Sequence, residues 1–560
     1  MKKLSIILFL SVFVFSCLST EQLQEKRYQE LLSYSETITP ELLRNHLEII
    51  AHDSLDGREA GTVGERKTAQ YLIDHYEKLG ISPKGTEGYL QPFIMNAERV
   101  DSLVYRTYNY DNDDMTEINY SSESKTGISD FIRLFGGSEP QSGDVIFGGF
   151  GVDDPSRDVE HLDDVAMKDK WVLIFDDIPH VVDGDTLINP AISNNQRAAN
   201  LLSRIQAKGV LVISDLSSDE FETMSSENSE MLEQPENMRL QYMDDSDQGG
   251  FPRAYTLISP EMAATFLDLN STNDLQQYRE ELISNITTFE PHLTNHFVDY
   301  TPYGGTVEIE SNNVLAFIEG NDPELKDEVV VLMGHYDHIG ITEPDETGDS
   351  INNGADDNGS GTSALLSIAE SLQKAADNGR KLNRSVLFLH VSAEEKGLLG
   401  SRYYSDHPVI PIDQTVTAFN TDMVGRSDPQ NLENGDTDYV YLIGGEIISS
   451  ELDSLVQSAN KQSVNMRLDR HYNDLTDSNQ FYRRSDHWNF GRLDVPFVFF
   501  FTGVHDDYHA PGDEVDKIDF EKLSRISRLI YTSTIQVANY DWRPEVDNEE
   551  FIRITRDQPR

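Results

Sequence analysis

The stretch HVSAEEKGLLG, residues 390–400, carries two adjacent carboxylates, Glu394 and Glu395. They directly follow the apolar run SVLFLHVSA, which predicts a buried β-strand. A carboxylate at the end of a buried strand is costly to desolvate unless a positive charge compensates it. Lys396 and a metal ion are both candidates for that charge.

Other polar side chains follow apolar runs in the same way, at several separate places in the second half of the chain. Open α/β sheets bind ligands at the carboxyl ends of their strands, so loops from different strands can meet in one crevice. We therefore expect these loops to converge on one site. The side chains concerned are His335, Asp337, Asp356, Asp357, Asp422, Tyr508 and His509.

These residue types suit a metal site. Histidines and carboxylates without a thiolate are ligands for zinc or a similar divalent ion. The loops supply more ligands than one four-coordinate zinc needs, and a carboxylate can bridge two ions. Such a site lowers the pKa of a bound water, and a carboxylate off the metal must then take the proton. The pair Glu394 and Glu395 can divide these tasks between ligand and base.

Five motifs occur in a characteristic order: HYD at 335–337, GADDNGSG at 354–361, AEEKGLLGS at 393–401, NTDMVG at 420–425 and YH at 508–509. In this order they resemble the di-zinc aminopeptidase family that includes the secreted bacterial leucine aminopeptidases. Glutamate carboxypeptidase and the transferrin receptor are its wider relatives. The resemblance covers residues 38–100 and 295–540.

The resemblance implies a role for each matching residue. One zinc is bound by His335 and Asp422, the other by Glu395 and His509, and Asp357 bridges them. The family also implies a cis peptide bond between Asp357 and Asn358.

Four further roles come from the same resemblance. Glu394 matches the general base, which takes a proton from a zinc-bound hydroxide or water. Asp337 matches the acid that orients His335 through its other ring nitrogen. Tyr508 matches a tyrosine that stabilises the oxyanion, and Arg484 is expected to approach the carbonyl or carboxylate side of the substrate. His338, Asp356 and His487 match no ligand position and are expected to be structural or to contact the ligands from outside, whereas His505, Asp506 and Asp507 are expected to be solvated or to order their loop.

The elements that must position these residues alternate between strand and helix from about residue 310 onward, which predicts an α/β fold. The strands are apolar on both faces, as in a largely parallel sheet. The resemblance implies a three-layer α/β/α peptidase domain with a mixed, largely parallel central sheet. Residues 101–294 resemble a protease-associated domain, a small β-rich insert, and the polar, acidic stretch 215–250 inside it is expected to be a long loop.

The N-terminus has the features of an export signal. A basic MKK precedes the apolar run LSIILFLSVFVFS, which is too short to span a bilayer and ends at Cys17. This pattern resembles a bacterial lipoprotein signal, so Cys17 is expected to be lipidated and to anchor the exported protein to a membrane. An ordinary signal peptide is the alternative. Cys17 is the only cysteine, so the mature chain has no disulfide.

The composition excludes nucleic acid as a partner. The chain has 98 acidic against 45 basic residues, a formal charge of −53, and thus no basic surface to neutralise phosphates. The 560 residues are too many for one ordinary core. The expected segments are a signal (1–17), a tether (18–37), the peptidase domain in two parts (38–100 and 295–545), the insert (101–294) and a tail (546–560).

These observations together predict an exported di-zinc exopeptidase that removes N-terminal residues from peptides with a free N-terminus. A carboxypeptidase of the glutamate-carboxypeptidase type is one alternative, and it should present several arginines to the cleft, where only Arg483 and Arg484 are candidates. A glutaminyl cyclase would bind a single zinc, and a non-catalytic receptor should have lost ligands or the base. Neither HExxH nor GxSxG occurs, which disfavours thermolysin-like and α/β-hydrolase sites.

Overall fold

The computed structural model describes residues 20–111, 114–124, 129–182, 184–231, 236–243 and 253–556. The predicted signal with Cys17 lies outside the described residues. The chain divides into two compact units: unit 1 runs to Ile94 and resumes at Glu310, and unit 2 spans Met95–Ile309. In the described part of the chain, no helix combines the length and hydropathy needed to cross a bilayer.

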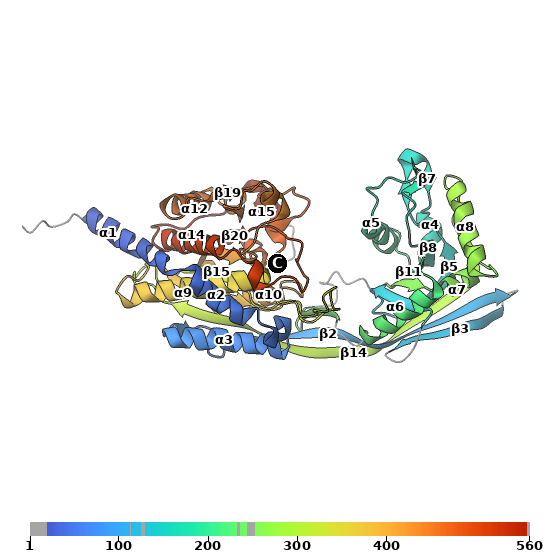
Figure 1. Ribbon diagram of the computed structural model, residues 1–560, viewed down its shortest axis with the longest axis horizontal. Coiled ribbons are helices and arrows are strands. Elements are labelled where there is room, and N and C mark those ends of the chain that lie inside the picture. The colour runs from blue at the N-terminus through green and yellow to red at the C-terminus, as the bar shows by residue number, and fades with distance from the viewer. Residues whose placement is uncertain are drawn as a thin grey trace, which may run out of the picture. The chain divides into compact units, whose positions relative to one another are not determined.

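Unit 1 is built on a mixed, mostly parallel sheet with the strand order β19-β18-β20-β17-β15-β16-β14 (Figure 1). Strands β16, β15, β17 and β20 run parallel to one another, and β14 and β18 join them antiparallel. These four parallel strands are buried along their whole length, which explains their continuous apolar sequences. The strands are β1 (Ser82–Pro83), β2 (Leu90–Asp111), β14 (His292–Ile318), β15 (Val329–His335), β16 (Ser385–Val391), β17 (Thr415–Thr421), β18 (Tyr439–Gly444), β19 (Arg467–Asp469) and β20 (Phe497–Phe501).

Helices cover both faces of this sheet, so the predicted three-layer α/β/α fold is confirmed. One hydrophobic cluster joins α2, α3, α9, α12 and α14 to one face, and another joins α10, α13 and α15 to the opposite face. The helices of unit 1 are α1 (Thr20–Ser33), α2 (Pro40–Ile50), α3 (Val63–Leu79), α9 (Gly361–Asp377), α10 (Leu399–Asp406), α11 (Pro429–Glu433), α12 (Ser450–Gln462), α13 (Trp488–Gly491), α14 (Phe520–Ala538) and α15 (Glu549–Arg556).

Helix α3 shows how local sequence sets its ends. The Thr62 hydroxyl, at the N-cap, accepts a hydrogen bond from the Glu65 amide, and the Glu65 carboxylate accepts one from the amide of Gly61, the residue before the N-cap. At the other end Gly80 takes a left-handed conformation with φ of 72°, as expected for a C-terminal cap.

The structure corrects two expectations about the ends of unit 1. Residues 20–33 of the predicted tether form helix α1, and Leu31 is buried in the same cluster as α14. In the predicted tail, residues 549–556 form helix α15, where Phe551 is fully buried against the sheet. The segments named a tether and a tail therefore each contain a helix that contributes to the core of unit 1.

Unit 2 contains a run of parallel strands in the order β5-β8-β11-β13, with β4 antiparallel at one end and β14 antiparallel at the other. Helices α7 and α8 contribute to the core on one face, and α5 and α6 to the core on the other. Its identification as a protease-associated domain stays a prediction. Its elements are β3 (Asp114–Ser124), β4 (Phe131–Phe135), β5 (Gln141–Phe147), β6 (Asp153–Asp154), β7 (Val159–Glu160), α4 (Asp164–Met167), β8 (Trp171–Phe175), β9 (Val181–Val182), β10 (Asp185–Thr186), α5 (Asn194–Ala199), β11 (Gly209–Ile213), α6 (Ser218–Met231), β12 (Glu236–Leu240), β13 (Tyr255–Ile258), α7 (Pro260–Phe266) and α8 (Thr272–Ser284).

The acidic stretch 215–250 is not the long loop that its composition predicts. It contains helix α6 and strand β12, and β12 pairs antiparallel with β2. Phe221 of α6 is buried at 2% exposure, so one aromatic side chain attaches a largely polar helix to the unit. Asp219 and Glu220 lie in the first turn of α6, where the helix dipole favours negative charge.

Candidate metal centre

The predicted site residues come from neighbouring strand ends in unit 1. His335 is the last residue of β15, and the pairing of β15 with β16 places it opposite Val391. Two residues separate the end of β16 from Glu394 and Glu395, and Asp422 directly follows β17. Because β15 runs parallel to both β16 and β17, these side chains all emerge at one edge of the sheet.

Asp357 comes from the turn that precedes helix α9. The backbone amides of Asp356 and Asp357 both donate to Asp513 Oδ2, at 2.9 and 3.0 Å. The Asn358 side chain donates to the carbonyl of Thr421, the last residue of β17, at 2.9 Å. The peptide bond between Asp357 and Asn358 is cis, as the family resemblance implies. These contacts fix the turn between the end of β17 and the loop that carries Asp513.

The buried carboxylate of Asp357 faces two histidines, one with each of its two oxygens. His335 Nε2 lies 3.2 Å from Asp357 Oδ1 and 3.3 Å from Asp422 Oδ1. His509 Nε2 lies 3.2 Å from Asp357 Oδ2 and 3.1 Å from Glu395 Oε2. The five predicted ligand residues therefore gather into two groups that share Asp357.

The charges of the two groups are coupled through Asp357. Burial alone would raise the pKa of this carboxyl, but hydrogen bonds to His335 and His509 lower it well below its ordinary value. Burial would lower the pKa of His509, and contacts with Asp357 and Glu395 instead raise it to about 10. Each histidine thus lies in a strongly negative environment. A cation bound between the ligands would neutralise the same carboxylate charges.

The donor set fits zinc. Imidazole nitrogens and carboxylate oxygens are zinc ligands, and two of them on a tetrahedral ion are about 3.3 Å apart. The measured separations in both groups agree with that value. Asp422 Oδ1 is buried, and the described residues offer it no hydrogen-bond partner, as expected for an oxygen that binds an ion.

Asp337 and Glu394 contact the centre from outside the five ligands. His335 Nδ1 lies 3.2 Å from the Asp337 carbonyl oxygen and 3.6 Å from Asp337 Oδ1, so the residue holds the far side of this ring. Asp337 Oδ1 also accepts a hydrogen bond from the Glu394 amide at 3.3 Å. Burial raises the pKa of Glu394 well above its ordinary value, although nearby His335 opposes the rise.

Tyr508 and Arg484 are placed differently. The ring of Tyr508 stacks on His509 with centroids 3.8 Å apart, so its position is tied to that of a predicted ligand. Arg484 is exposed and lies over the ring of Phe481 at 5.3 Å. The structure therefore brings Tyr508 to the centre, whereas Arg484 lies over Phe481 at the surface.

The segment RRSDHWNF reaches the centre through residues that the sequence did not single out. Ser485 Oγ donates to Asp422 Oδ2 at 2.8 Å. Asp486 is fully buried, and burial raises its pKa to about 7, with Asp422 and Asp337 adding to the rise. In the sequence, Arg484 was the residue of this segment for which a role was expected. Nothing in the local sequence indicated a role for Ser485 or Asp486.

His338 contacts a predicted ligand from outside, which is one of the two roles expected for it. It is fully buried, and its Nδ1 lies 2.8 Å from Glu395 Oε1. The other oxygen of Glu395 faces His509, so His338 orients this carboxylate between two imidazoles. His505 was expected to be solvated or to order its loop; it is not solvated, because it is buried at 5% exposure, with Nε2 3.5 Å from Asp356 Oδ2.

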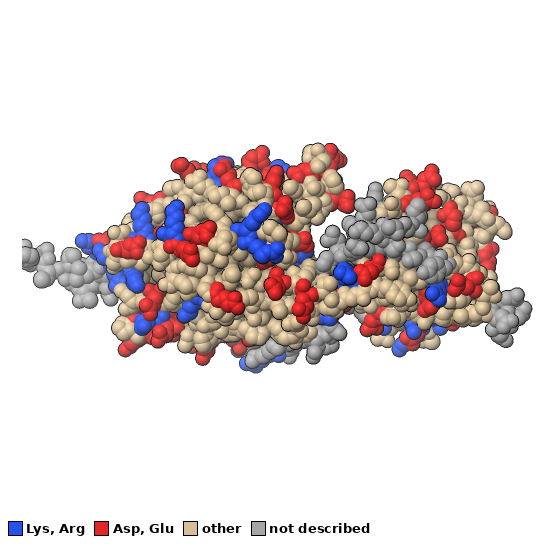
Figure 2. Space-filling view, turned by 90° about the horizontal axis from the view of Figure 1, so that it is seen from below, with Lys and Arg blue, Asp and Glu red and all other residues tan. Residues whose placement is uncertain are grey.

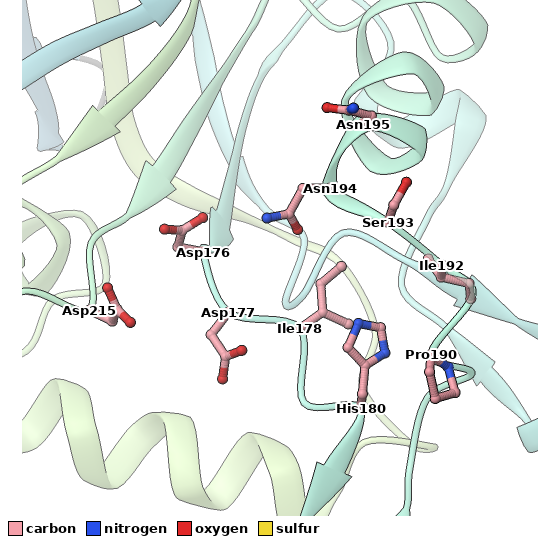
Figure 3. Close-up of a pocket in the computed structure, with 10 residues that line it drawn as sticks. All are labelled: Asp176, Asp177, Ile178, His180, Pro190, Ile192, Ser193, Asn194, Asn195 and Asp215. Atoms are coloured by element: carbon pink, nitrogen blue, oxygen red, sulfur yellow. The ribbon is translucent and has the colours of Figure 1, made fainter. Parts of the chain in front are cut away.

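Unit 2 has a separate cavity of about 590 Å³. Asp176 and Asp177 follow strand β8 and Asp215 follows β11, and Figure 3 shows them on the loops that leave these strands. Ser193 and Asn194, at the start of helix α5, line the same cavity. None of the residues lining this cavity belongs to the predicted metal site.

Comparisons with known proteins identify the part of unit 1 that carries the centre. The model of peptidase family M28 matches residues 313–534, which include all five predicted ligands. Aminopeptidase YwaD of Bacillus subtilis is 26% identical over 240 residues, covering 40% of this chain and 44% of that protein. Leucine aminopeptidase 2 of Arthroderma otae is 28% identical over 252 residues, covering 40% and 45%. The chain spans about half the length of the curated relatives it matches.

A solved structure extends the likeness to most of the chain. The aminopeptidase from Aneurinibacillus sp. strain AM-1 has a TM-score of 0.52 with 18% sequence identity, and the match covers 92% of this chain and 97% of that one. At this identity the likeness shows a shared fold. The family model therefore matches residues 313–534, and the shared fold extends over most of the chain.

Proposed function

We propose that the chain is a di-zinc aminopeptidase, which removes N-terminal residues from peptides. The observation that carries the proposal is the position of Asp357, whose two oxygens face His335 and His509 separately. His335 and Asp422 would hold one zinc, and Glu395 and His509 the other. When bound, two zinc ions polarise a peptide carbonyl and lower the pKa of water.

Glu394 is the residue best suited to move the proton. It lies within ligand distance of His335 and Glu395 but takes no part in the two groups around Asp357. Its carboxylate would accept a proton from the attacking water as the new C–O bond forms. It would then donate this proton to the leaving amine as the C–N bond breaks, so no proton is gained or lost overall.

The choice of an aminopeptidase over a carboxypeptidase rests on charge. The centre gathers the carboxylates of Asp357, Asp422, Glu394 and Glu395, which favour a protonated α-amino group. Arg483 and Arg484 are both exposed, so they do not form a buried pocket for a substrate carboxylate. The relatives reported above are also named as aminopeptidases.

A comparison of free and blocked peptides tests the reaction. Purified protein would be incubated with aminoacyl peptides and with their N-acetylated counterparts, with and without a metal chelator. We expect cleavage of the free peptides only, and its loss when the chelator removes the metal. Equal cleavage of blocked and free peptides would rule out an aminopeptidase, and activity that survives complete metal removal would rule out the metal centre.

Substitution of Glu394 by Gln tests the division of roles between the two glutamates. The variant Glu394→Gln should keep the zinc content of the wild type but lose roughly 10²–10⁴-fold in turnover, because only the base is removed. The exposed residue Glu343 offers a matched control, and Glu343→Gln should retain full activity. If Glu394→Gln instead loses zinc, the roles of Glu394 and Glu395 are reversed.

The proposed site of action is outside the cytoplasm, with a lipid anchor at Cys17. The support is the basic, apolar and cysteine-terminated N-terminal sequence. Replacement Cys17→Ser should move the full-length protein from the membrane fraction to a released, still exported fraction. A variant that stays with membranes would exclude Cys17 as the anchor.

A further inference from the structure

Three helices of unit 1 bring a second set of ligand atoms together, apart from the centre around Asp357. His46 lies on α2, His75 on α3 and Glu370 on α9, and these helices pack against one another (Figure 1). His46 Nε2 and His75 Nε2 lie 3.5 and 3.4 Å from the same atom, Glu370 Oε1. All three ligand atoms fall within 4.8 Å of one another.

The two histidine nitrogens are buried and unsatisfied. His46 is 4% exposed and His75 is 9% exposed. In the described structure neither Nε2 has a hydrogen-bond partner, although each lies close to Glu370. Buried polar atoms are nearly always paired, so these two atoms require an explanation.

The two rings are held in place by their neighbours. His46 Nδ1 lies 2.8 Å from the Tyr71 hydroxyl, one turn before His75 on α3. The rings of His46 and His75 meet edge to face, with centroids 4.7 Å apart. In this arrangement the Nε2 atoms of both rings face Glu370 Oε1.

A metal ion between the three ligand atoms would give each of the two unsatisfied nitrogens a partner. Two ligands on a tetrahedral zinc are about 3.3 Å apart, which agrees with the observed 3.4 and 3.5 Å. The Glu370 side chain is 30% exposed, so an ion and a water ligand can reach the site.

We propose that His46, His75 and Glu370 form a third metal site, selective for zinc or a similar transition ion and independent of the proposed catalytic pair. Two imidazoles favour such ions over magnesium or calcium. The bound ion ties together α2, α3 and α9. Helix α9 begins at Gly361, directly after the turn that carries Asp357, so the site braces the helix behind the catalytic centre.

Zinc counting tests this site in the full-length, tag-free protein. The protein would be stripped with a chelator, reloaded with zinc, desalted and subjected to elemental analysis. The variants His75→Gln and Glu370→Gln should each hold one equivalent of zinc less than the wild type. The exposed histidine His471 provides the control, and His471→Gln should match the wild type. Equal zinc content in wild type and both cluster variants would overturn the proposal.

The zinc-induced shift of the thermal midpoint is a second readout. It separates loss of the metal site from destabilisation caused by the substitution itself. Addition of zinc to stripped protein should raise the thermal midpoint of the wild type by more than that of Glu370→Gln, whose side chain keeps its size. Peptide cleavage by zinc-loaded Glu370→Gln should remain within about twofold of the wild type, because the site touches no reacting atom. An equal zinc-induced shift in both proteins would contradict the site, whether or not the peptidase activity exists.

Discussion

Lys396 does not neutralise the two glutamates that precede it. Its Nζ lies 2.6 Å from Glu59 Oε1, and this ion pair leaves Glu394 and Glu395 without a lysine partner. The charge that compensates the strand-end carboxylates must therefore come from another source. The proposed zinc ions would supply it, because histidines that bind zinc are neutral.

The Tyr508 hydroxyl is suited to donate a hydrogen bond to a developing oxyanion. Burial raises its pKa above the ordinary value, and the nearby Asp357 and Glu395 raise it further, so the phenol keeps its proton at neutral pH. The variant Tyr508→Phe should lose about 10²-fold in kcat, with little change in zinc content. Steady-state kinetics with a free aminoacyl peptide measures the loss.

The control for this substitution is Tyr303→Phe, at a tyrosine that is 51% exposed. It should behave as the wild type. If Tyr508→Phe also keeps the kcat of the wild type, a different group stabilises the oxyanion.

His487 is a neutral histidine built into the core beside the centre. It is fully buried, and its Nε2 lies 3.1 Å from the Phe481 carbonyl, which can only accept. Its Nδ1 lies 3.3 Å from Asn420 Nδ2, and the ring stacks on Phe499 with centroids 4.6 Å apart. A second proton on this ring would meet the Asn420 donor rather than an acceptor.

This arrangement makes stability depend on pH. Burial lowers the pKa of His487 to about 3, below the value of about 6.5 for an unfolded histidine. The unfolded state therefore binds more protons at acidic pH, and the contribution to stability is present above about pH 6.5 and is lost as the pH falls toward 3. From pH 6.5 to 5, wild type should lose about 1.5 kcal/mol more unfolding free energy than His487→Gln.

Urea denaturation of metal-free protein at each pH measures the difference, because metal release then makes no contribution. The surface variant His471→Gln should follow the wild type. Parallel pH profiles for wild type and His487→Gln would show that this histidine does not control acid stability.

At the residue scale, the candidate ligands and base lie in short motifs at strand ends, and the family resemblance implied their roles, which stay predictions. Ser485 and Asp486 were not predicted because their contacts with the centre form across strands. Ser485 meets Asp422 only after β17 and the later segment pack together, and no local pattern records that contact.

At the element scale, the sequence predicted the strands of unit 1 well because buried parallel strands are apolar on both faces. Helix α6 was missed since its sequence is acidic and has little amphipathic periodicity, and its single buried aromatic, Phe221, is a weak signal. Helices α1 and α15 were not predicted either, and α15 is strongly amphipathic but has only eight residues. Such short, polar helices are stabilised by tertiary contacts rather than by their own sequence.

Arg58 connects three elements beneath the metal centre. It is fully buried, and its guanidinium donates to the carbonyls of Tyr336 at 3.0 Å, Ile50 at 2.9 Å, Asn353 at 2.6 Å and Gly354 at 3.1 Å. These carbonyls belong to the segment after β15, the end of α2 and the loop before the Asp357 turn. The planar guanidinium group, with its several N–H donors, is needed to reach all four carbonyls.

The variant Arg58→Lys should therefore be destabilised by roughly 2–4 kcal/mol, since an ammonium group cannot replace every bond and leaves buried carbonyls unpaired. Urea denaturation would measure this loss. The exposed Arg66 provides the control, and Arg66→Lys should change stability by less than about 0.5 kcal/mol. If both variants unfold at the same urea concentration as wild type, the carbonyl contacts of Arg58 contribute little.

At the scale of the whole molecule, negative charge dominates. The formal charge is −53, and Figure 2 shows acidic side chains widely spread over the visible face, with basic ones among them. Many acids form local ion pairs, but a large uncompensated excess remains. Like charges repel one another more strongly in the folded state, where they lie closer together than in the unfolded chain.

Screening by salt should therefore stabilise the fold. The Debye length falls from about 30 Å at 0.01 M to about 3 Å at 1 M ionic strength, so repulsion between distant surface acids is largely removed. The thermal midpoint should rise with sodium chloride over this range, by about 1–2 °C for each kcal/mol of repulsion relieved in a chain of this length. Differential scanning calorimetry in sodium chloride and in choline chloride measures it. Equal rises in the two salts indicate screening, a rise in sodium alone would indicate specific cation binding, and a falling midpoint would show that favourable ion pairs outweigh the repulsion.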